Sequence, residues 1–299
     1  MSASSLLLPS SVVSLPTSCS LASQEDDTPL IDLSNRCAVE KLLADFHHPT
    51  DVLLAHAATV QIRRLLSIEV CSPIDEVLSL GVVPRLVEFL ARSDQPRLQF
   101  EAAWALTNIA SGNTDETAVI LKAGALPRFI ELLSSPHADL RDQCAWAIAN
   151  IAGDGSEARD MCFQLGAMPA LLAQFRNNDT PNYVVQKATW AVSNLCRGKP
   201  APPLAAVDMA IPLLVQLVTH ADEDIVTDAA WAISYITDDS DAHKRERIIR
   251  SGVVPRMVQL LGHENPVVRV PAVRTIGNIV SGTLLLQSNG ENRLIGDRN

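Results

Sequence analysis

Tryptophan and asparagine recur four residues apart at three places in the sequence, as Trp104 with Asn108, Trp146 with Asn150 and Trp190 with Asn194. Residues four apart lie on one face of a helix, one turn above each other. An asparagine amide carries two donor hydrogens and an acceptor, so it can meet the unpaired backbone groups of an extended peptide. Between parallel indole rings the methylene stem of a lysine or arginine packs, and its charged head gains a cation–π attraction. The repeated pair therefore predicts a surface that binds an extended basic peptide.

The pairs belong to a longer series of related segments. The tryptophans, the last of which is Trp231, follow one another after 42, 44 and 41 residues. Trp231 is followed by Tyr235 in place of asparagine, and a fifth copy has Arg274 and Asn278. A single tryptophan on a helix is usually a core residue. Asparagine is a poor helix former, however, and its recurrence in register with the indole favours a ladder that contacts a ligand.

A second marker keeps the same period. Glycine is followed by proline three residues later at Gly81, Gly124, Gly166 and Gly252. Glycine ends one helix at positive φ, and proline fits the first turn of the next. Each unit is thus predicted as a short helix, a middle helix and a longer helix that carries the tryptophan. A helical period of roughly 40 to 47 residues is typical of armadillo and HEAT repeats. The expected fold is all-α, an armadillo-repeat right-handed superhelical solenoid with a long concave surface.

Composition excludes several other classes of protein. Hydrophobic residues make up 47% of the 299 residues and aromatic residues 4%, which suits helices packed on helices. The net charge of −10 argues against direct binding of nucleic acid and favours cationic partners. No run of 18 apolar residues is present, so no membrane association is expected. The six scattered cysteines fit a reducing compartment and predict no metal site or cofactor.

No catalytic constellation stands out in the sequence. The phosphate-binding loop, the zinc-protease His-Glu-x-x-His and the Gly-x-Ser-x-Gly nucleophile motif are absent. His47 and His48 are adjacent and would face different directions on a helix. The acidic run at 238–241 lacks the spacing of a calcium-binding loop and is expected to be a solvated connection. The chain is therefore predicted not to be an enzyme.

Over residues 45–283 the repeats resemble those of the importin alpha family, adaptors that recognise nuclear localisation signals in cargo proteins. The resemblance rests on the tryptophan–asparagine pairs, on the segment 193–200 and on the segment 274–278. It implies that the second to fourth repeats form the major signal-binding site. There the tryptophans would sandwich lysine stems while the three asparagines hold the peptide backbone.

The resemblance also implies roles for further residues. The most selective lysine pocket would surround Asp154, with Gly112 and Thr117 as its other wall. Ser111 and Gln143 match accessory contacts. From the residues alone, Asp154 could instead cap the helix that follows it, because Gly155 and Ser156 come next.

Other residues would extend this site or lie at its edges. Acidic residues near the tryptophan helices would complete the charge complement: Asp142, Asp154, Asp228 and Asp238. Trp231 and Tyr235 continue the ladder, and Arg274 with Asn278 marks the start of a second, minor site. Lys187 stands where the family commonly has asparagine. A cation there would weaken lysine binding unless it points to solvent.

The sequence departs from the family at both ends. No lysine or arginine precedes Arg36, so the basic segment through which the family binds importin beta is expected to be absent. The predicted organisation is a disordered Ser/Leu-rich segment at 1–36, about six armadillo repeats at 37–283 and a polar tail at 284–299.

The predicted function is that of a nuclear import adaptor in the cytoplasm and nucleus. Its partners would be lysine- and arginine-rich nuclear localisation signals, bound as extended peptides on the concave surface. Two alternatives remain open. The chain could be a general armadillo scaffold for other proteins, or a truncated regulator that sequesters cargo.

Overall fold

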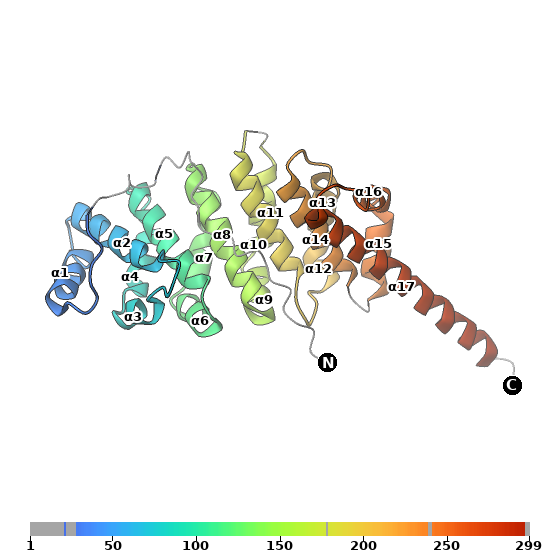
Figure 1. Cartoon of the computed structure of the whole chain (residues 1–299), viewed down its shortest axis with the longest axis horizontal. Helices are drawn as coiled ribbons and strands as arrows, with labels where there is room; N and C mark the ends of the chain where they lie inside the picture. Colours follow the sequence, from blue (N-terminus) through green and yellow to red (C-terminus); the bar gives the residue numbers. More distant parts are fainter. Residues whose placement is uncertain (1–20, 22–27, 178, 239–240, 297–299) are drawn as a thin grey trace.

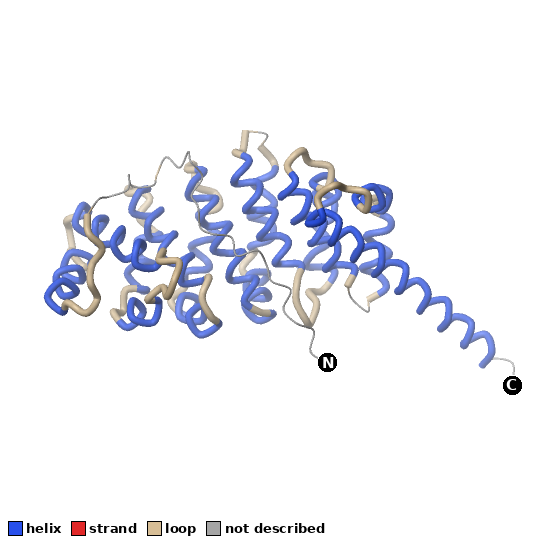
Figure 2. Tube along the Cα trace, viewed as in Figure 1, coloured by secondary structure: helices blue, strands red, loops and turns tan. Residues whose placement is uncertain are grey.

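The computed structural model describes Leu21 and residues 28–177, 179–238 and 241–296. Every regular element in these residues is a helix, as Figure 2 shows. The predicted all-α architecture is confirmed for this part of the chain.

The helices are arranged as one pair followed by five units of three. The pair is α1 (Arg36–Phe46) and α2 (Val52–Leu66). The first helices of the units are α3 (Ile74–Ser79), α6 (Thr114–Lys122), α9 (Ser156–Gln164), α12 (Leu204–Val207) and α15 (Ala242–Arg250). The middle helices are α4 (Val83–Leu90), α7 (Ala125–Leu132), α10 (Ala167–Leu172), α13 (Ile211–Leu217) and α16 (Val254–Leu260). The third helices are α5 (Pro96–Ala110), α8 (Ala138–Asp154), α11 (Asn182–Cys196), α14 (Glu223–Thr237) and α17 (Pro266–Gly296). Short 3₁₀ turns, η1 (Ala173–Phe175) and η2 (Asp208–Ala210), extend α10 and precede α13.

Glycine and proline separate the first helix of a unit from the middle one, as predicted. Gly81, Gly124, Gly166 and Gly252 have φ between 70° and 83°. This left-handed conformation strains any residue with a side chain, so glycine is required at the turn. The prolines that follow lie in the first turns of α4, α7, α10 and α16, where their missing N–H groups cost no hydrogen bond.

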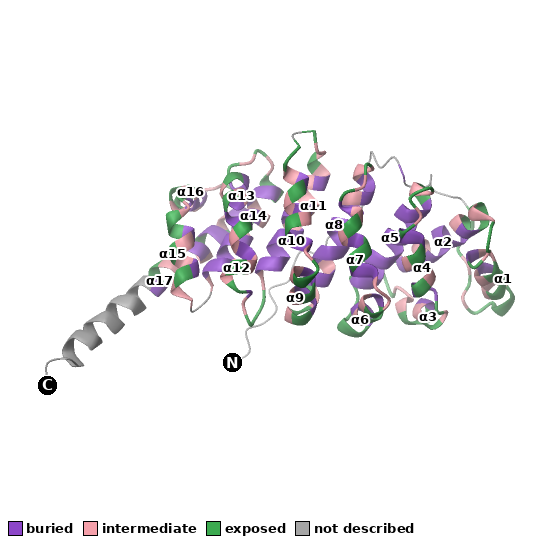
Figure 3. Ribbon diagram, turned by 180° about the vertical axis from the view of Figure 1, so that it is seen from behind, coloured by how far each residue is buried: buried purple, intermediate pink, exposed green. Residues whose placement is uncertain are grey.

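The third helices form the spine of the molecule. α2, α5, α8, α11, α14 and α17 pack successively on one another, and Figure 1 shows α5, α8 and α11 side by side in an elongated row. α5 is buried continuously from Leu98 to Ala110, and buried residues run along the other third helices as well (Figure 3). Many of these positions are alanine, which lets the helices approach closely. Each unit buries its apolar surface against its neighbours, as in a solenoid.

The ends of the chain differ from the prediction where they are described. Ile31 and Leu33 pack against the hydrophobic core, and the N–H of Leu21 donates to Asp139 Oδ2 at 3.1 Å. Residues 28–35, which belong to the segment for which the sequence predicts disorder, therefore contact the core through Ile31 and Leu33. Residues 1–20 and 22–27 of that segment lie outside the described residues. At the other end, α17 continues to Gly296, so most of the predicted polar tail is helical.

None of the helices in the described ranges combines the length and apolar character that a membrane span requires.

Candidate peptide-binding surface

The predicted aromatic and amide residues lie in one row across the third helices. Trp104, Trp146, Trp190 and Trp231 occupy equivalent places on α5, α8, α11 and α14. One turn later on the same helices come Asn108, Asn150, Asn194 and Tyr235. Because these helices pack in order, these eight side chains lie on neighbouring helices, and we call them the tryptophan row. Trp104 and Trp146 are only 5% and 7% exposed, whereas Trp190 and Trp231 are half-buried.

The asparagine amides tie each repeat to the one before it. Asn150 Nδ2 donates to the carbonyl of Thr107 at 3.2 Å, and Asn194 Nδ2 donates to the carbonyl of Ala149 at 2.9 Å. Asn108 Nδ2 donates to Ser67 Oγ at 3.0 Å, at the end of α2. Asn278 in α17 donates to the carbonyl of Ser234 at 3.1 Å. The recurring amides therefore have a structural role that the sequence pattern did not reveal, because they join neighbouring helices.

The amide oxygens remain available to a ligand. Within the described residues, no donor bonds to Oδ1 of Asn108, Asn150 or Asn194. Asn150 is the most accessible of the three, since it is half-buried while the other two are almost fully buried. An acceptor without a donor can take the N–H of a peptide backbone.

Cations of the chain itself lie over the indole rings. The guanidinium of Arg63, from α2, lies 4.1 Å from the centre of the Trp104 ring, and Arg63 Nε pairs with Glu101 Oε2 at 2.8 Å. Arg274 lies 5.9 Å from the Trp231 ring and 5.5 Å from Tyr235. Sequence reasoning missed Arg63, because nothing in the local pattern shows that it reaches an indole 41 positions further on.

Lys187 also points at the row. Its Nζ lies 4.0 Å from the centre of the Trp146 ring and 6.0 Å from that of Trp190. Both distances are within the range of cation–π attraction. The sequence left open whether this lysine points to solvent, and the structure places its ammonium between the two indoles.

The acidic residues near the row fall into different environments. Burial raises the pKa of Asp142 to about 7, opposed by the attraction of Lys187. Burial likewise raises the pKa of Asp228 to about 7, helped by repulsion from Asp224 and opposed by Lys187. Asp238 pairs with Arg274 at 2.5 Å and with Lys199 at 3.8 Å, so its charge is already compensated.

Asp154 ends α8 and, unlike Asp238, forms no ion pair within the described residues. Its Oδ1 accepts a hydrogen bond from Thr114 Oγ1 at 2.9 Å, and no cation in the described ranges pairs with it. It does not cap α9, whose N-terminus begins at Gly155 and has no side-chain cap. A carboxylate at the C-terminus of a helix opposes the helix dipole, so helix stability does not explain its position.

The remaining predicted residues lie close by but differ in exposure. Ser111 and Gly112 are exposed at the end of α5. A side chain at Gly112 would collide with Glu116, which forms a capping box with Asn113 at the start of α6. Thr117 and Gln143 are buried, at 0% and 2% exposure, so neither lines an open surface here.

Buried polar atoms without a hydrogen-bond partner gather at this site. They include Trp104 Nε1, Thr117 Oγ1, Asp142 Oδ1 and Gln143 Nε2. Such atoms are rare in folded proteins because each loses its hydration without compensation.

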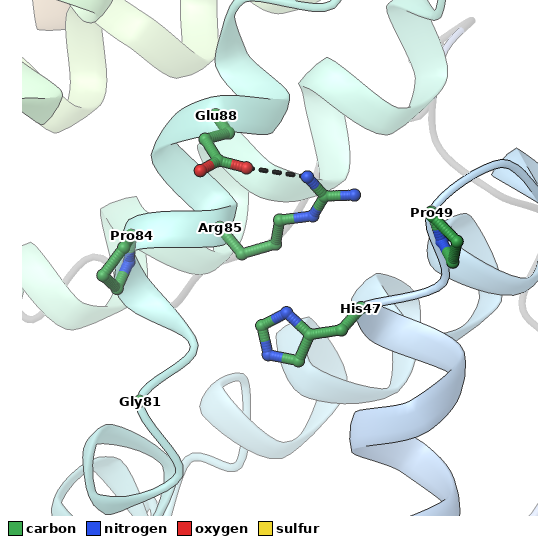
Figure 4. A pocket seen from close by; sticks show the side chains of 6 residues that line it. All are labelled: His47, Pro49, Gly81, Pro84, Arg85 and Glu88. Atoms are coloured by element: carbon green, nitrogen blue, oxygen red, sulfur yellow. Dashed lines mark hydrogen bonds and ion pairs between the residues drawn. The ribbon is translucent and has the colours of Figure 1, made fainter.

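A depression elsewhere on the surface does not include the row. It lies between the end of α1 and α4 and is lined by His47, Pro49, Gly81, Pro84, Arg85 and Glu88 (Figure 4). Arg85 Nη1 pairs with Glu88 Oε2 at 2.7 Å across its floor. None of the predicted site residues lines it. Among the residues that the structure describes, no cluster of histidine, cysteine or acidic side chains could hold a metal ion.

The repeat class follows from these features and from comparison with known families. The Armadillo/beta-catenin-like repeat matches residues 71–111, 113–153, 155–197, 199–238 and 241–281. These segments coincide with the five three-helix units, and the chain belongs to the armadillo repeat family. The sequence predicted about six repeats, and the α1–α2 pair is the portion that the family repeat does not match.

Within that family the chain is similar to alpha subunits of importin. It is 54% identical over 225 residues to importin subunit alpha-3 of Arabidopsis thaliana, covering 75% of this chain and 42% of that protein. It is 56% identical over 226 residues to importin subunit alpha-B of Dictyostelium discoideum, covering 75% of this chain and 44% of that protein. The chain thus spans about two fifths of the length of these relatives.

Solved structures agree with the fold. A designed armadillo repeat protein in complex with the peptide (KR)4 superposes with a TM-score of 0.71 at 25% identity, covering 81% of this chain and 97% of that one. These comparisons agree with the armadillo fold of the chain.

The raised pKa values make stability depend on pH. The folded chain retains protons on Asp142 and Asp228 up to about pH 7, whereas the unfolded chain releases them near pH 4. The folded state therefore binds more protons in this interval, and the free energy of unfolding falls as pH rises from about 4 to about 7.

Replacing Asp142 tests this dependence. The Asp142→Asn variant is expected to gain stability over the parent chain as pH rises from 5 to 8, by on the order of 2 kcal/mol. Urea unfolding at several pH values measures the difference. Asp94→Asn is the matched control, because Arg92 already holds the pKa of Asp94 at about 2. A pH-independent difference for Asp142→Asn would contradict the assignment.

Proposed function

We propose that the chain binds lysine- and arginine-rich nuclear localisation signals as extended peptides along the tryptophan row and acts as an adaptor in nuclear import. The observation that carries the proposal is the site between Trp104 and Trp146. There two neighbouring helices present indoles, Asn150 presents a free amide oxygen, and Asp154 presents a carboxylate without a cation. The cations over these two indoles come from the helices that flank the pair, Arg63 from α2 and Lys187 from α11.

The comparisons support this proposal. The relatives named above are importin alpha subunits, and the designed armadillo protein was solved with a peptide of alternating lysine and arginine. A peptide of that kind suits a chain with a net charge of −10. A protein with this role would act in the cytoplasm and nucleus.

The chain alone is expected to bind a short lysine-rich signal peptide with a Kd of about 10 μM or lower. Alanine in place of the lysines should weaken binding at least tenfold, about 1.4 kcal/mol, because the carboxylate and the indoles lose their cation. Calorimetric titration measures both constants. Equal affinity for the alanine peptide would favour a general armadillo scaffold instead.

A second arm of this experiment concerns importin beta. Residues 1–35 contain no lysine or arginine, so this chain is expected not to bind importin beta at micromolar concentration. Peptide binding without importin beta binding would show that the chain binds signal peptides independently of importin beta. A micromolar complex with importin beta would show that another part of the chain makes the contact.

A further inference from the structure

Lys187 differs in position from the other cations near the tryptophan row. Arg63 approaches Trp104 from the preceding α2, and Arg274 approaches Trp231 from the following α17, so each covers an outer end of the row. Lys187 instead lies within the row, with its Nζ 4.0 Å from Trp146 and 6.0 Å from Trp190. It therefore fills the gap between two consecutive indoles, the place that a peptide cation would take.

The surroundings hold this ammonium in place. Asp142 on α8 and Asp228 on α14 both feel its attraction, from either side of α11. No ion pair joins Lys187 to either carboxyl group within the described residues, and its Nζ contacts two ring faces instead. Trp146 is only 7% exposed with the lysine above it. The gap between Trp146 and Trp190 is thus already filled and already positive.

A peptide lysine that enters this gap must displace Lys187 or lie beside it. Both outcomes cost binding energy, because the first loses the existing cation–π contact and the second places two ammonium groups together. A small neutral side chain avoids both costs, and a carboxylate gains attraction. Within the described residues, no cation is close to both Trp104 and Trp146 in the way that Lys187 is close to both Trp146 and Trp190.

We propose that Lys187 is a specificity-determining residue that closes the gap between Trp146 and Trp190 to lysine and arginine and makes it select a neutral or acidic peptide residue. The inference rests on the proposed function, since it assumes that peptides bind along the row. It predicts that the preferred peptide has lysine or arginine residues next to one position at which lysine and arginine are disfavoured.

The test is a positional scan of a lysine-rich peptide. Each lysine is changed in turn to alanine and to glutamate, and every peptide is titrated against the parent chain and against Lys187→Gln. Lys122→Gln is the matched control, because Lys122 is exposed at the end of α6. Lys187→Met serves as a second variant that keeps an aliphatic stem over Trp146 without the charge.

The parent chain and Lys122→Gln are expected to tolerate alanine or glutamate at one peptide position with less than a threefold loss. At that same position, Lys187→Gln and Lys187→Met should prefer lysine to alanine by at least fivefold. Both variants should also bind the all-lysine peptide at least fivefold more tightly than the parent does.

Two other results would overturn the inference, and they differ from each other. If the parent and both variants lose affinity equally at every peptide position, Lys187 swings aside and does not select, while the proposed function stands. If none of the proteins binds any lysine-rich peptide, the proposed function fails and the inference fails with it.

Discussion

Reversing the charge of Asp154 with Asp154→Lys is expected to weaken binding of a lysine-rich peptide at least thirtyfold, about 2 kcal/mol. The change replaces an attraction by a repulsion at a carboxylate that no cation of the described chain neutralises. Asp154 is the last residue of α8, where a positive charge complements the helix dipole better than a negative one. The thermal midpoint should therefore change little, because the lost Thr114 hydrogen bond is offset by the improved helix end.

The control for this experiment is Glu157→Lys, which makes the same charge change at an exposed position three residues further on. It measures the general electrostatic effect on a cationic peptide, which should be below threefold in physiological salt. Full peptide affinity in Asp154→Lys would show that the lysine pocket lies elsewhere. A large loss of stability would show that Asp154 serves folding.

The second large effect is expected on stability. Replacing Arg63 by methionine should lower the free energy of unfolding by about 3 kcal/mol, because it removes the guanidinium that pairs with a fully buried carboxylate. The Glu101 side chain is 0% exposed, and Arg63 Nε lies 2.8 Å from its Oε2. The same change also uncovers the Trp104 ring. Chemical denaturation of both proteins gives the difference.

Arg64→Met is the matched control, because the neighbouring guanidinium makes an exposed hydrogen bond to the carbonyl of Thr28. The Arg64→Met change should lower the free energy of unfolding by less than about 1 kcal/mol. Adding Glu101→Gln to Arg63→Met should recover part of the stability, since the buried charge is then removed. Equal small losses for the two arginine variants would mean that the buried pair contributes little.

The repeat fold could be predicted because its signals are local. The spacing of Trp146 and Asn150 fits one turn of helix, and Gly124 marks a turn at positive φ that the structure confirms. The period of the tryptophans then fixes the number and order of the third helices. The row itself follows from stacking those helices in sequence.

The fine structure of the site could not be predicted because it depends on contacts between repeats. The amide of Asn194 bonds Ala149, 45 residues earlier, and Lys187 reaches Trp146 on the neighbouring helix. Such contacts are set by how two helices pack and not by the order of residues within either. The sequence therefore identified Lys187 as a cation near the site but could not place its ammonium.

Tyr235 in the tryptophan row affects the order in which the solenoid unfolds. Tyr235 replaces asparagine in α14, so no amide of this kind joins α14 to α11, and Tyr235 stacks on Trp231 instead. The polar contacts recorded between these two helices are two exposed side-chain bonds, Asn182 to Asp222 and Gln186 to Asp224. In a linear array whose members interact only with their neighbours, cooperativity breaks at the weakest coupling. Because the two preceding junctions of the row each keep an amide bond, partial unfolding is expected to separate α14 from α11 before it separates α11 from α8 or α8 from α5.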